Sequence, residues 1–336
     1  MYTLLWLAVL VGAATAIIWW GSIALETATD RLALHYGLPA IVQGSILTAV
    51  GSSFPEIASV VIATLRYGEF ELGVAAIVGS ALFNVLVIPA VAALVNRETL
   101  ESNRALVYRE AQFYIISVAT LLLTFSLAVI YFPSDDGALF GEITRLLALF
   151  PLALYGLYIF IQYQEAADYR ADLSPPEINV GKQWAALALS LLAILVGVEI
   201  LVGAAVDLGS YFDTPSFLWG ITIIAAATSL PDAIISIRAS RSGDSTISLA
   251  NVFGSNIFDL LVAIPVGVLL AGATPIDFGV AAPLMGFLVV ATIIVFAAAR
   301  TDFALTNREA WLLISVYVLF VGWMLLESTG VTNILL

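Results

Sequence analysis

Long apolar segments alternate with short polar breaks along almost the whole chain. A segment of about 20 apolar residues is enough to cross the hydrocarbon core of a bilayer. The breaks between the segments carry charged residues, proline or glycine, which are typical of helix ends and loops. The pattern therefore predicts an all-α integral membrane protein with ten transmembrane helices. The predicted spans are residues 3–26, 39–65, 70–95, 108–132, 142–163, 183–206, 216–239, 245–271, 278–299 and 308–327.

The composition excludes several functional classes. Of the 336 residues, 61% are hydrophobic and only 11% are charged, which leaves no room for a soluble catalytic domain. The absence of cysteine excludes thiolate chemistry, and the single histidine, His35, excludes a multi-histidine metal site. No phosphate-binding glycine loop is present, and the few basic residues do not suggest nucleic acid. We therefore expect neither an enzyme nor a primary pump, and no resident cofactor.

The basic residues fall unevenly on the two sides of the predicted membrane. Cytoplasmic loops are enriched in Lys and Arg. If the N-terminus is outside, ten of the twelve basic residues lie inside, and only Arg66 and Arg145 lie outside. The first span also lacks a basic start and a cleavage site, so it is expected to be a retained helix. This distribution predicts a multi-pass protein of the cell membrane with both termini outside.

The two halves of the chain repeat one another. A shift of 175 or 176 positions aligns Pro55 with Pro231 and Asn84 with Asp259, and six of the twelve prolines pair in this way. Because each half holds five spans, an odd number, the second half must enter the membrane from the opposite side. Inverted repeats of this kind are frequent in secondary transporters, although channels also use them.

We therefore predict two inverted five-helix repeats. The first repeat is residues 1–163, with its motif segment at 39–95. The second is residues 184–336, with its motif segment at 216–271, and residues 164–183 form a cytoplasmic linker.

Four acidic residues lie deep within predicted spans: Glu56, Glu199, Asp232 and Asp259. A carboxylate at the centre of a membrane helix costs roughly 2.5 to 3.5 kcal/mol even on insertion scales. No intramembrane Lys or Arg is available to neutralise three of them, so a bound cation is the natural partner. Glu199 has no acidic counterpart in the other half, and we expect it to pair with a hydroxyl or to face a polar cavity.

Hydroxyl and amide side chains share the helix faces of the other three carboxylates. Serine or threonine lies three and four residues before Glu56 and Asp232, and a serine lies four residues before Asn84 and before Asp259. Pro55 and Pro231 also leave backbone carbonyls without an N–H partner. Such an all-oxygen site suits Ca²⁺ or Na⁺ rather than zinc or copper. The candidate ion-binding residues are Ser52, Ser53, Glu56, Ser80, Asn84, Thr228, Ser229, Asp232, Ser255 and Asp259.

These motif segments resemble the two α-repeats of the cation/calcium exchanger superfamily. In that family the acidic residue after the proline and the polar residue four positions after the Gly-Ser serine bind ions, which implies the same ten residues here. The chain departs from the usual pattern at Asp232, where glutamate is common, and at Ala76 and Ala81, where many relatives have asparagine. These features look most like the potassium-dependent sodium/calcium subfamily.

The resemblance implies antiport across the lipid bilayer, in which Na⁺ entering drives Ca²⁺ outward by alternating access. Three carboxylates carry about -3, which three Na⁺ would balance, whereas one Ca²⁺ would leave a charge for K⁺ or a proton. A proton/calcium exchanger of the same superfamily is the nearest alternative, and a passive cation channel is a more distant one. The sequence leaves the stoichiometry and the oligomeric state open.

Overall fold

A computed structural model describes residues 2–37, 49–96, 100–101, 109–135, 137–166, 178–241, 245–332 and 335. Within them, nine helices are long and apolar enough to span a membrane, and they coincide with nine of the ten predicted spans. The remaining predicted span, 39–65, begins with residues outside the described ranges. Its described part forms α2 (Ala49–Ser52) and α3 (Phe54–Tyr67). The chain is thus a nearly all-helical, multi-pass membrane protein.

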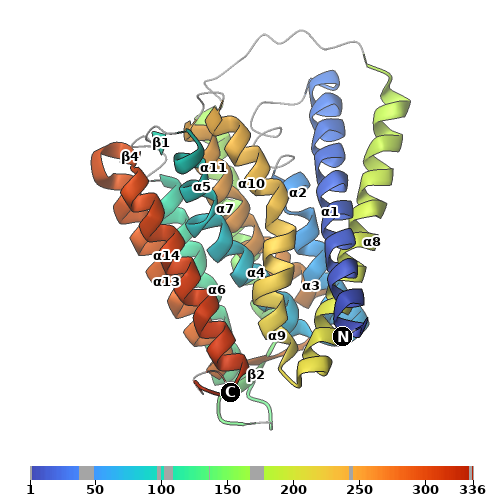
Figure 1. Ribbon diagram of the computed structural model, residues 1–336, viewed down its shortest axis with the longest axis vertical. Helices are drawn as coiled ribbons and strands as arrows, with labels where there is room; N and C mark the ends of the chain where they lie inside the picture. The colour runs from blue at the N-terminus through green and yellow to red at the C-terminus, as the bar shows by residue number, and fades with distance from the viewer. Residues whose placement is uncertain are drawn as a thin grey trace.

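The elements follow in chain order and are drawn in Figure 1. The first half contains α1 (Tyr2–His35), α2, α3, α4 (Phe70–Leu86), α5 (Ile88–Asn96), β1 (Leu100–Glu101), α6 (Ala111–Tyr131), β2 (Phe140–Ile143) and α7 (Arg145–Ala166). The second half contains α8 (Val180–Phe212), α9 (Ser216–Trp219), the π-helix η3 (Gly220–Ile224), α10 (Ala225–Arg241), α11 (Ser245–Phe258), the π-helix η4 (Asp259–Ala263), α12 (Ile264–Ala271), β3 (Thr274–Asp277), α13 (Phe278–Arg300), the 3-10 helix η5 (Thr301–Phe303), β4 (Ala304–Leu305) and α14 (Asn307–Ser328).

The strands correct the expectation of a purely α-helical chain. β1 pairs with β4, and β2 pairs with β3, each as a two-stranded antiparallel sheet. Both sheets join segments that connect membrane helices, where backbone groups need partners that a helix no longer supplies. β2 also occupies the start of the span predicted at 142–163, so α7 begins three residues later than expected.

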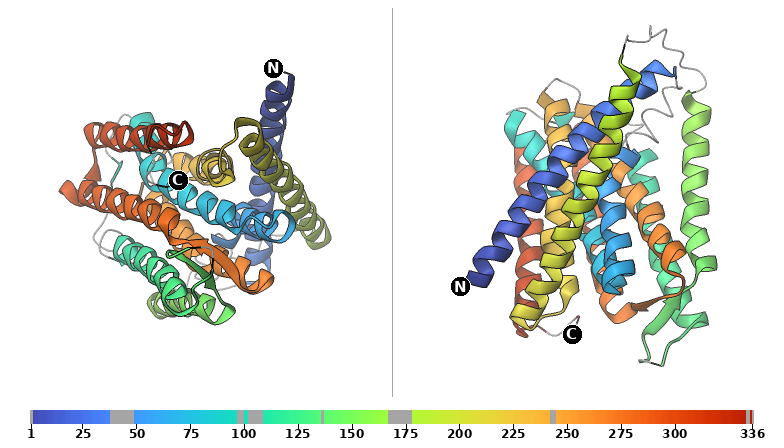
Figure 2. Two further views of the ribbon diagram at one scale, coloured as in Figure 1. Left: turned by 90° about the horizontal axis from the view of Figure 1, so that it is seen from below. Right: turned by 90° about the vertical axis from the view of Figure 1, so that its right-hand side faces the viewer.

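Two helices are much longer than their predicted spans. α1 has 34 residues and α8 has 33, which at 1.5 Å per residue is about 50 Å, well beyond the ~30 Å hydrocarbon core. The two helices run side by side and strongly tilted at one edge of the molecule (Figure 2). Because α7 and α8 reach Ala166 and Val180, they also extend into the predicted linker 164–183, whose middle lies outside the described residues.

The helices divide into a buried centre and a lipid-facing periphery. In the apolar window of α4–α5, 83% of the residues are buried, and in that of α11–α12, 78%; in α1 the share is 22%. A helix that is hydrophobic all round and buried belongs to the protein interior. The α4–α5 and α11–α12 parts of the motif segments therefore lie in the core. Both chain termini lie at the same end of the bundle (Figure 1).

Candidate ion-binding site

Four central segments supply all ten predicted ion-binding residues: α2–α3, α4, α10 and α11–η4. These segments contact one another in the middle of the bundle. Each of the ten residues is buried, with at most 2% of its surface exposed. The structure therefore gathers the residues that sequence spacing placed on separate helix faces.

Hydrogen bonds between side chains of the two halves tie the site together. The Ser80 and Ser229 hydroxyls lie 2.7 Å apart, and the Ser80 hydroxyl also donates to Glu56 Oε1 over 3.4 Å. The Asn84 amide donates from Nδ2 to Asp232 Oδ2 over 3.2 Å. Side chains of α4 thus bridge the acid of α3 to the polar residues of α10.

The three carboxylates have oxygens that the protein leaves unpaired. Glu56 Oε2, Asp232 Oδ1 and both carboxylate oxygens of Asp259 are buried without a hydrogen-bond partner in the described part of the chain. None of the three makes an ion pair with a described basic residue. They also lie close enough to repel: Glu56 interacts electrostatically with Asp259 and Asp232, and Asp259 with Asp232. Buried unpaired carboxylate oxygens are costly unless something else satisfies them, so they point to a cation.

The carboxylates do not converge on a single point. Among the described residues, no group of three acidic side chains is arranged to hold one metal ion. An ion at this site would therefore draw part of its coordination from neutral oxygens. Two are free: the Ser53 hydroxyl and Asn84 Oδ1 are buried and unpartnered. Mixed carboxylate and neutral oxygen coordination is usual for Ca²⁺.

The two proline-acid motifs differ in backbone geometry. In the first, the helix breaks at Ser53, and Pro55 lies in the first turn of α3, where its missing N–H costs nothing. In the second, α10 continues through Pro231, and the irregularity is the π-helix η3, which ends at Ile224. The interruption that we expected at the motif is thus present in the first half, whereas in the second it is displaced toward the N-terminus.

Asn256 is a site residue that the sequence analysis missed. It is fully buried, accepts from Asn84 Nδ2 through Oδ1 over 3.0 Å, and donates from Nδ2 to the Ala81 carbonyl over 3.1 Å. Together with Asp232 it occupies the Asn84 amide nitrogen, which leaves Asn84 Oδ1 free. Its position directly after Ser255 could have indicated a role in the site. Its counterpart in the first half, Ala81, is apolar and therefore did not suggest one.

Glu199 lies outside the site and has partners of its own. It forms an ion pair with Arg66 Nε at 2.8 Å and accepts from the Tyr67 hydroxyl at 3.0 Å. The expected pairing with a hydroxyl is confirmed. The sequence analysis did not foresee Arg66, because it assigned that residue to a loop rather than to the end of α3.

Two further carboxylates are buried at helix ends. Glu110 accepts from the Tyr158 hydroxyl and from Gln162, and pairs with Arg109. Glu327 accepts from the Thr332 hydroxyl and the Leu335 backbone N–H. Because each has donors of its own, neither resembles the unsatisfied acids of the central site.

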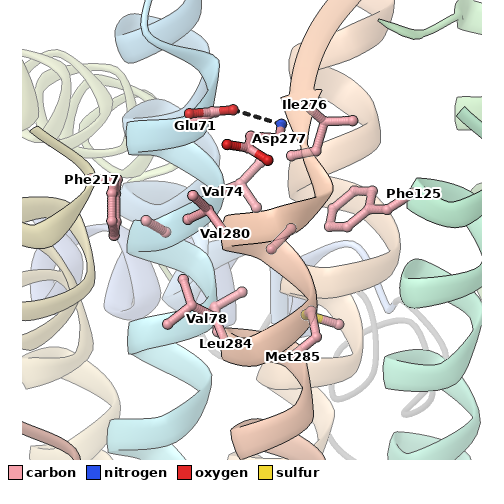
Figure 3. Close-up of a pocket in the computed structure, with 12 residues that line it drawn as sticks. Glu71, Val74, Val78, Phe125, Phe217, Ile276, Asp277, Val280, Leu284 and Met285 are labelled. Carbon is pink, nitrogen blue, oxygen red and sulfur yellow. Dashed lines mark hydrogen bonds between the residues drawn. The ribbon is translucent and has the colours of Figure 1, made fainter. Parts of the chain in front are cut away.

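A separate small pocket lies between α4 and α13 (Figure 3). Its lining is mostly apolar, but Glu71 and Asp277 line one side. Glu71 Oε1 accepts from the Asp277 backbone N–H at 2.7 Å, and Asp277 Oδ1 caps α13 by accepting from the Gly279 N–H at 2.7 Å. These carboxylates therefore anchor β3 and the start of α13.

The aligned glycines of the two halves, Gly79 and Gly254, meet different surroundings in the described part of the chain. A Cβ atom on Gly79 would lie 2.3 Å from the Ile221 carbonyl oxygen, so α4 and η3 approach as closely as glycine allows. Small residues such as Gly79 allow membrane helices to pack closely. A Cβ atom on Gly254 would have no atom of the described residues within 4 Å.

Known proteins resemble the chain in sequence and in fold. The family model described as sodium/calcium exchanger protein matches residues 6–164 and 182–326. The putative antiporter CaxA of Alkalimonas amylolytica is 30% identical over 266 residues, which cover 78% of this chain and 80% of that protein. The solved sodium-calcium exchanger NCX_Mj has a TM-score of 0.62 at 20% identity, covering 94% of this chain and 98% of its own. The H⁺/Ca²⁺ exchanger CAX has a TM-score of 0.68 at 14% identity, covering 96% and 88%.

Proposed function

The chain belongs to the sodium/calcium exchanger protein family, and on that premise we propose that it is a secondary antiporter exchanging Na⁺ for Ca²⁺ by alternating access. One observation carries the proposal: three buried carboxylates share one region of the bundle, and four of their oxygens have no partner among the described residues. Sites of this kind, with polar groups facing the bundle interior, mark ion pathways in membrane proteins.

Charge balance at the site would couple the movement of one ion to that of the other. With Glu56, Asp232 and Asp259 ionised, the empty site carries about -3 in a low-dielectric interior, where uncompensated charge is expensive. Three Na⁺, or one Ca²⁺ with one further monovalent cation, would neutralise it. Only the loaded site could then move between its two open sides at low cost, which is what couples one ion to the other.

The ten buried residues named from the sequence are the proposed ion ligands. Hydroxyls and the Asn84 amide oxygen would complete the coordination shell that the carboxylates begin. The additional monovalent cation is proposed to bind at Asp259, since neither carboxylate oxygen of Asp259 has a hydrogen-bond partner among the described residues. K⁺ or H⁺ would both satisfy it.

Proton/calcium exchange is the competing function. The fold likeness to CAX favours it as much as the likeness to NCX_Mj favours sodium coupling. A proton on one buried carboxylate would balance the charge as well as a metal cation does. The shared chemistry is Ca²⁺ antiport, and the driving ion distinguishes the two.

The test is ⁴⁵Ca²⁺ uptake into proteoliposomes under one imposed gradient at a time. The proposal expects uptake driven by an outward Na⁺ gradient, with little uptake when only a pH gradient is present. Uptake driven by the pH gradient and indifferent to Na⁺ would establish the proton/calcium reading instead. Ca²⁺ movement without any counter-gradient, at channel-like rates, would contradict antiport.

We further propose that the chain is built of two inverted repeats in the cell membrane, with both termini outside. The uneven distribution of basic residues supports this orientation. Because the chain has no cysteine, single cysteines placed at each terminus and in the 164–183 linker can be labelled without background. An impermeant maleimide should reach the termini in intact cells and reach the linker only after lysis; the reverse pattern would overturn the orientation.

A further inference from the structure

A groove of about 280 Å³ lies between α1 and α8, away from the ion site. On α1 its lining residues recur every three or four positions from Trp20 to Arg31, which is one face of a helix. α8 contributes Lys182, Gln183 and Ala186. We propose that this groove binds one anionic phospholipid of the surrounding bilayer.

Charge favours an anionic occupant. Arg31 and Lys182 line the same end of the groove, are both exposed, and make no ion pair with any described residue. The nearby acids of α1, Glu26 and Asp30, are not among the residues that line the groove. Glu26 interacts electrostatically with Asp30 and, across the contact of α1 with α10, with Asp232 and Arg238. Two cations without an ion-pair partner among the described residues thus lie at the mouth of the groove, in a chain whose net charge is -13.

The dimensions favour a lipid over a free anion. From Trp20 to Arg31 the helix rises about 16 Å along its tilted axis, so the groove passes through most of the ~15 Å hydrocarbon depth of one leaflet. Between these ends the floor is formed by small residues such as Ala24, Ala28 and Ala186. An acyl chain would fill the hollow that these alanines leave, while the phosphate would meet the two cations.

Aromatic residues mark the level of the headgroups. The exposed Trp184 indole, two residues after Lys182, donates over 3.3 Å to the hydroxyl of Tyr36, the residue that follows α1. Trp and Tyr are enriched where membrane meets water, and basic pockets between membrane helices bind anionic headgroups. The basic end of the groove is therefore placed at the interface, and its apolar end within the bilayer.

A lipid seated there would contact both helices at once. α1 and α8 pack against each other along their length, but at this level the groove separates their surfaces. The bound lipid would fill that separation and hold the two helices in one relative position.

The test is binding of phosphatidylglycerol to the purified full-length chain in detergent, followed by native mass spectrometry. Phosphatidylcholine with the same acyl chains and glycerol phosphate without chains serve as comparison ligands. We expect phosphatidylglycerol to be retained in preference to both. Equal retention of phosphatidylcholine would overturn the charge argument, and equal binding of glycerol phosphate would overturn the lipid argument.

Removal of the basic pair sharpens the test. Each basic residue near an anionic headgroup contributes ~1 kcal/mol, so the double variant Arg31→Gln with Lys182→Gln should bind phosphatidylglycerol roughly thirtyfold more weakly. The matched control is Arg241→Gln with Arg308→Gln, which removes two exposed arginines outside the groove. A loss of the same size in the control would mean that lipid binding depends on the overall surface charge rather than on the basic pair, and the proposal would fail.

Filling the groove provides an independent variant. Ala24→Phe places a ring on the apolar floor without altering charge, and it should weaken phosphatidylglycerol retention while the melting temperature in detergent stays unchanged. Unchanged retention in this folded variant would show that the acyl chain does not lie in the groove.

Discussion

The two halves of the ion site supply different chemistry from aligned positions. The first half contributes one carboxylate, Glu56, and a neutral amide, Asn84. The second half contributes two carboxylates, Asp232 and Asp259, and the additional amide of Asn256. The site is therefore asymmetric in charge although its segments repeat in sequence.

The asymmetry extends to the backbone. Val87 separates α4 from α5 three residues after Asn84, whereas the π-helix η4 begins at Asp259 itself. Both irregularities lead to a helix with proline in its second position, Pro89 in α5 and Pro265 in α12. Similar sequences thus keep the position of the break but not its form, and a π-turn at a carboxylate is often a functional feature.

The difference between Asn84 and Asp259 sets the net charge of the site. If both positions were asparagine the site would carry about -2, and if both were aspartate about -4. The Asn84 and Asp259 pairing gives about -3, and Asn256 holds the neutral partner in place. The following experiments test this difference between the halves, beginning with the substitutions that should have the largest effect.

The largest expected effect comes from the two acids that the halves share. Glu56→Gln and Asp232→Asn should each reduce ⁴⁵Ca²⁺ flux to the level of empty liposomes, because each removes a charged ligand while keeping the side-chain shape. Folding should survive, since a buried charge without an ion-pair partner is replaced by a neutral group.

The control for these variants is Glu142→Gln, which neutralises an exposed acid in β2. It should transport normally. If either site variant kept a normal Ca²⁺ flux, the two halves would not be equivalent partners in binding.

The second effect concerns stability and the glycines. Gly79→Ala should destabilise the protein by about 2 to 3 kcal/mol, because the new methyl group would overlap the Ile221 carbonyl. Gly254→Ala should be neutral or stabilising by up to ~1 kcal/mol, since alanine favours helix and no atom of the described residues lies within 4 Å. Melting in detergent distinguishes the two variants; equal loss at both would mean that the halves pack alike.

Sequence reasoning predicted which polar residues lie together in the bundle centre better than it predicted the backbone. Period and spacing placed Glu56, Ser80 and Asp232 on polar helix faces, and burial in lipid made their grouping almost obligatory. Nine predicted spans coincide with helices because apolar length is a direct consequence of bilayer thickness. Pro55, Pro89 and Pro265 each lie just after a helix irregularity, whereas α10 continues through Pro231.

The features that were missed depend on contacts between segments distant in sequence. Asn256 acts on Asn84, which lies 172 positions away, and no local pattern reports such a pair. The same holds for Glu199 and Arg66, and for the short sheets that join loops. The internal repeat also pointed away from Asn256, because the residue aligned with it in the first half, Ala81, is apolar.

A smaller effect is expected at the position where the halves differ in charge. Asp259→Asn makes the second half resemble the first and leaves two carboxylates, enough for Ca²⁺ alone. Ca²⁺ flux should persist but should no longer rise when K⁺ is added on the calcium side.

The wild-type protein is the reference for that measurement, with an impermeant organic cation replacing K⁺ at matched ionic strength. A wild-type Ca²⁺ flux that does not change with K⁺ would exclude the hypothesis of potassium dependence but would still be compatible with sodium/calcium exchange. Flux that rises with falling pH instead would assign the third charge to a proton on Asp259.

The smallest expected effect lies at Asn256, which positions a ligand without being one of the ten. Asn256→Ala removes the acceptor for Asn84 Nδ2 and the donor to the Ala81 carbonyl, each bond contributing about 1 kcal/mol. Asn84 retains its bond to Asp232 but can turn about it, so its free oxygen is no longer fixed. The half-saturating Ca²⁺ concentration should rise roughly three- to tenfold, while maximal flux changes less. Asn179→Ala is the matched control, because it removes the N-cap of α8 at a similar cost of ~1 kcal/mol and touches no site residue. A general loss of stability would change both variants alike, whereas a positioning role predicts a changed Ca²⁺ affinity in Asn256→Ala alone.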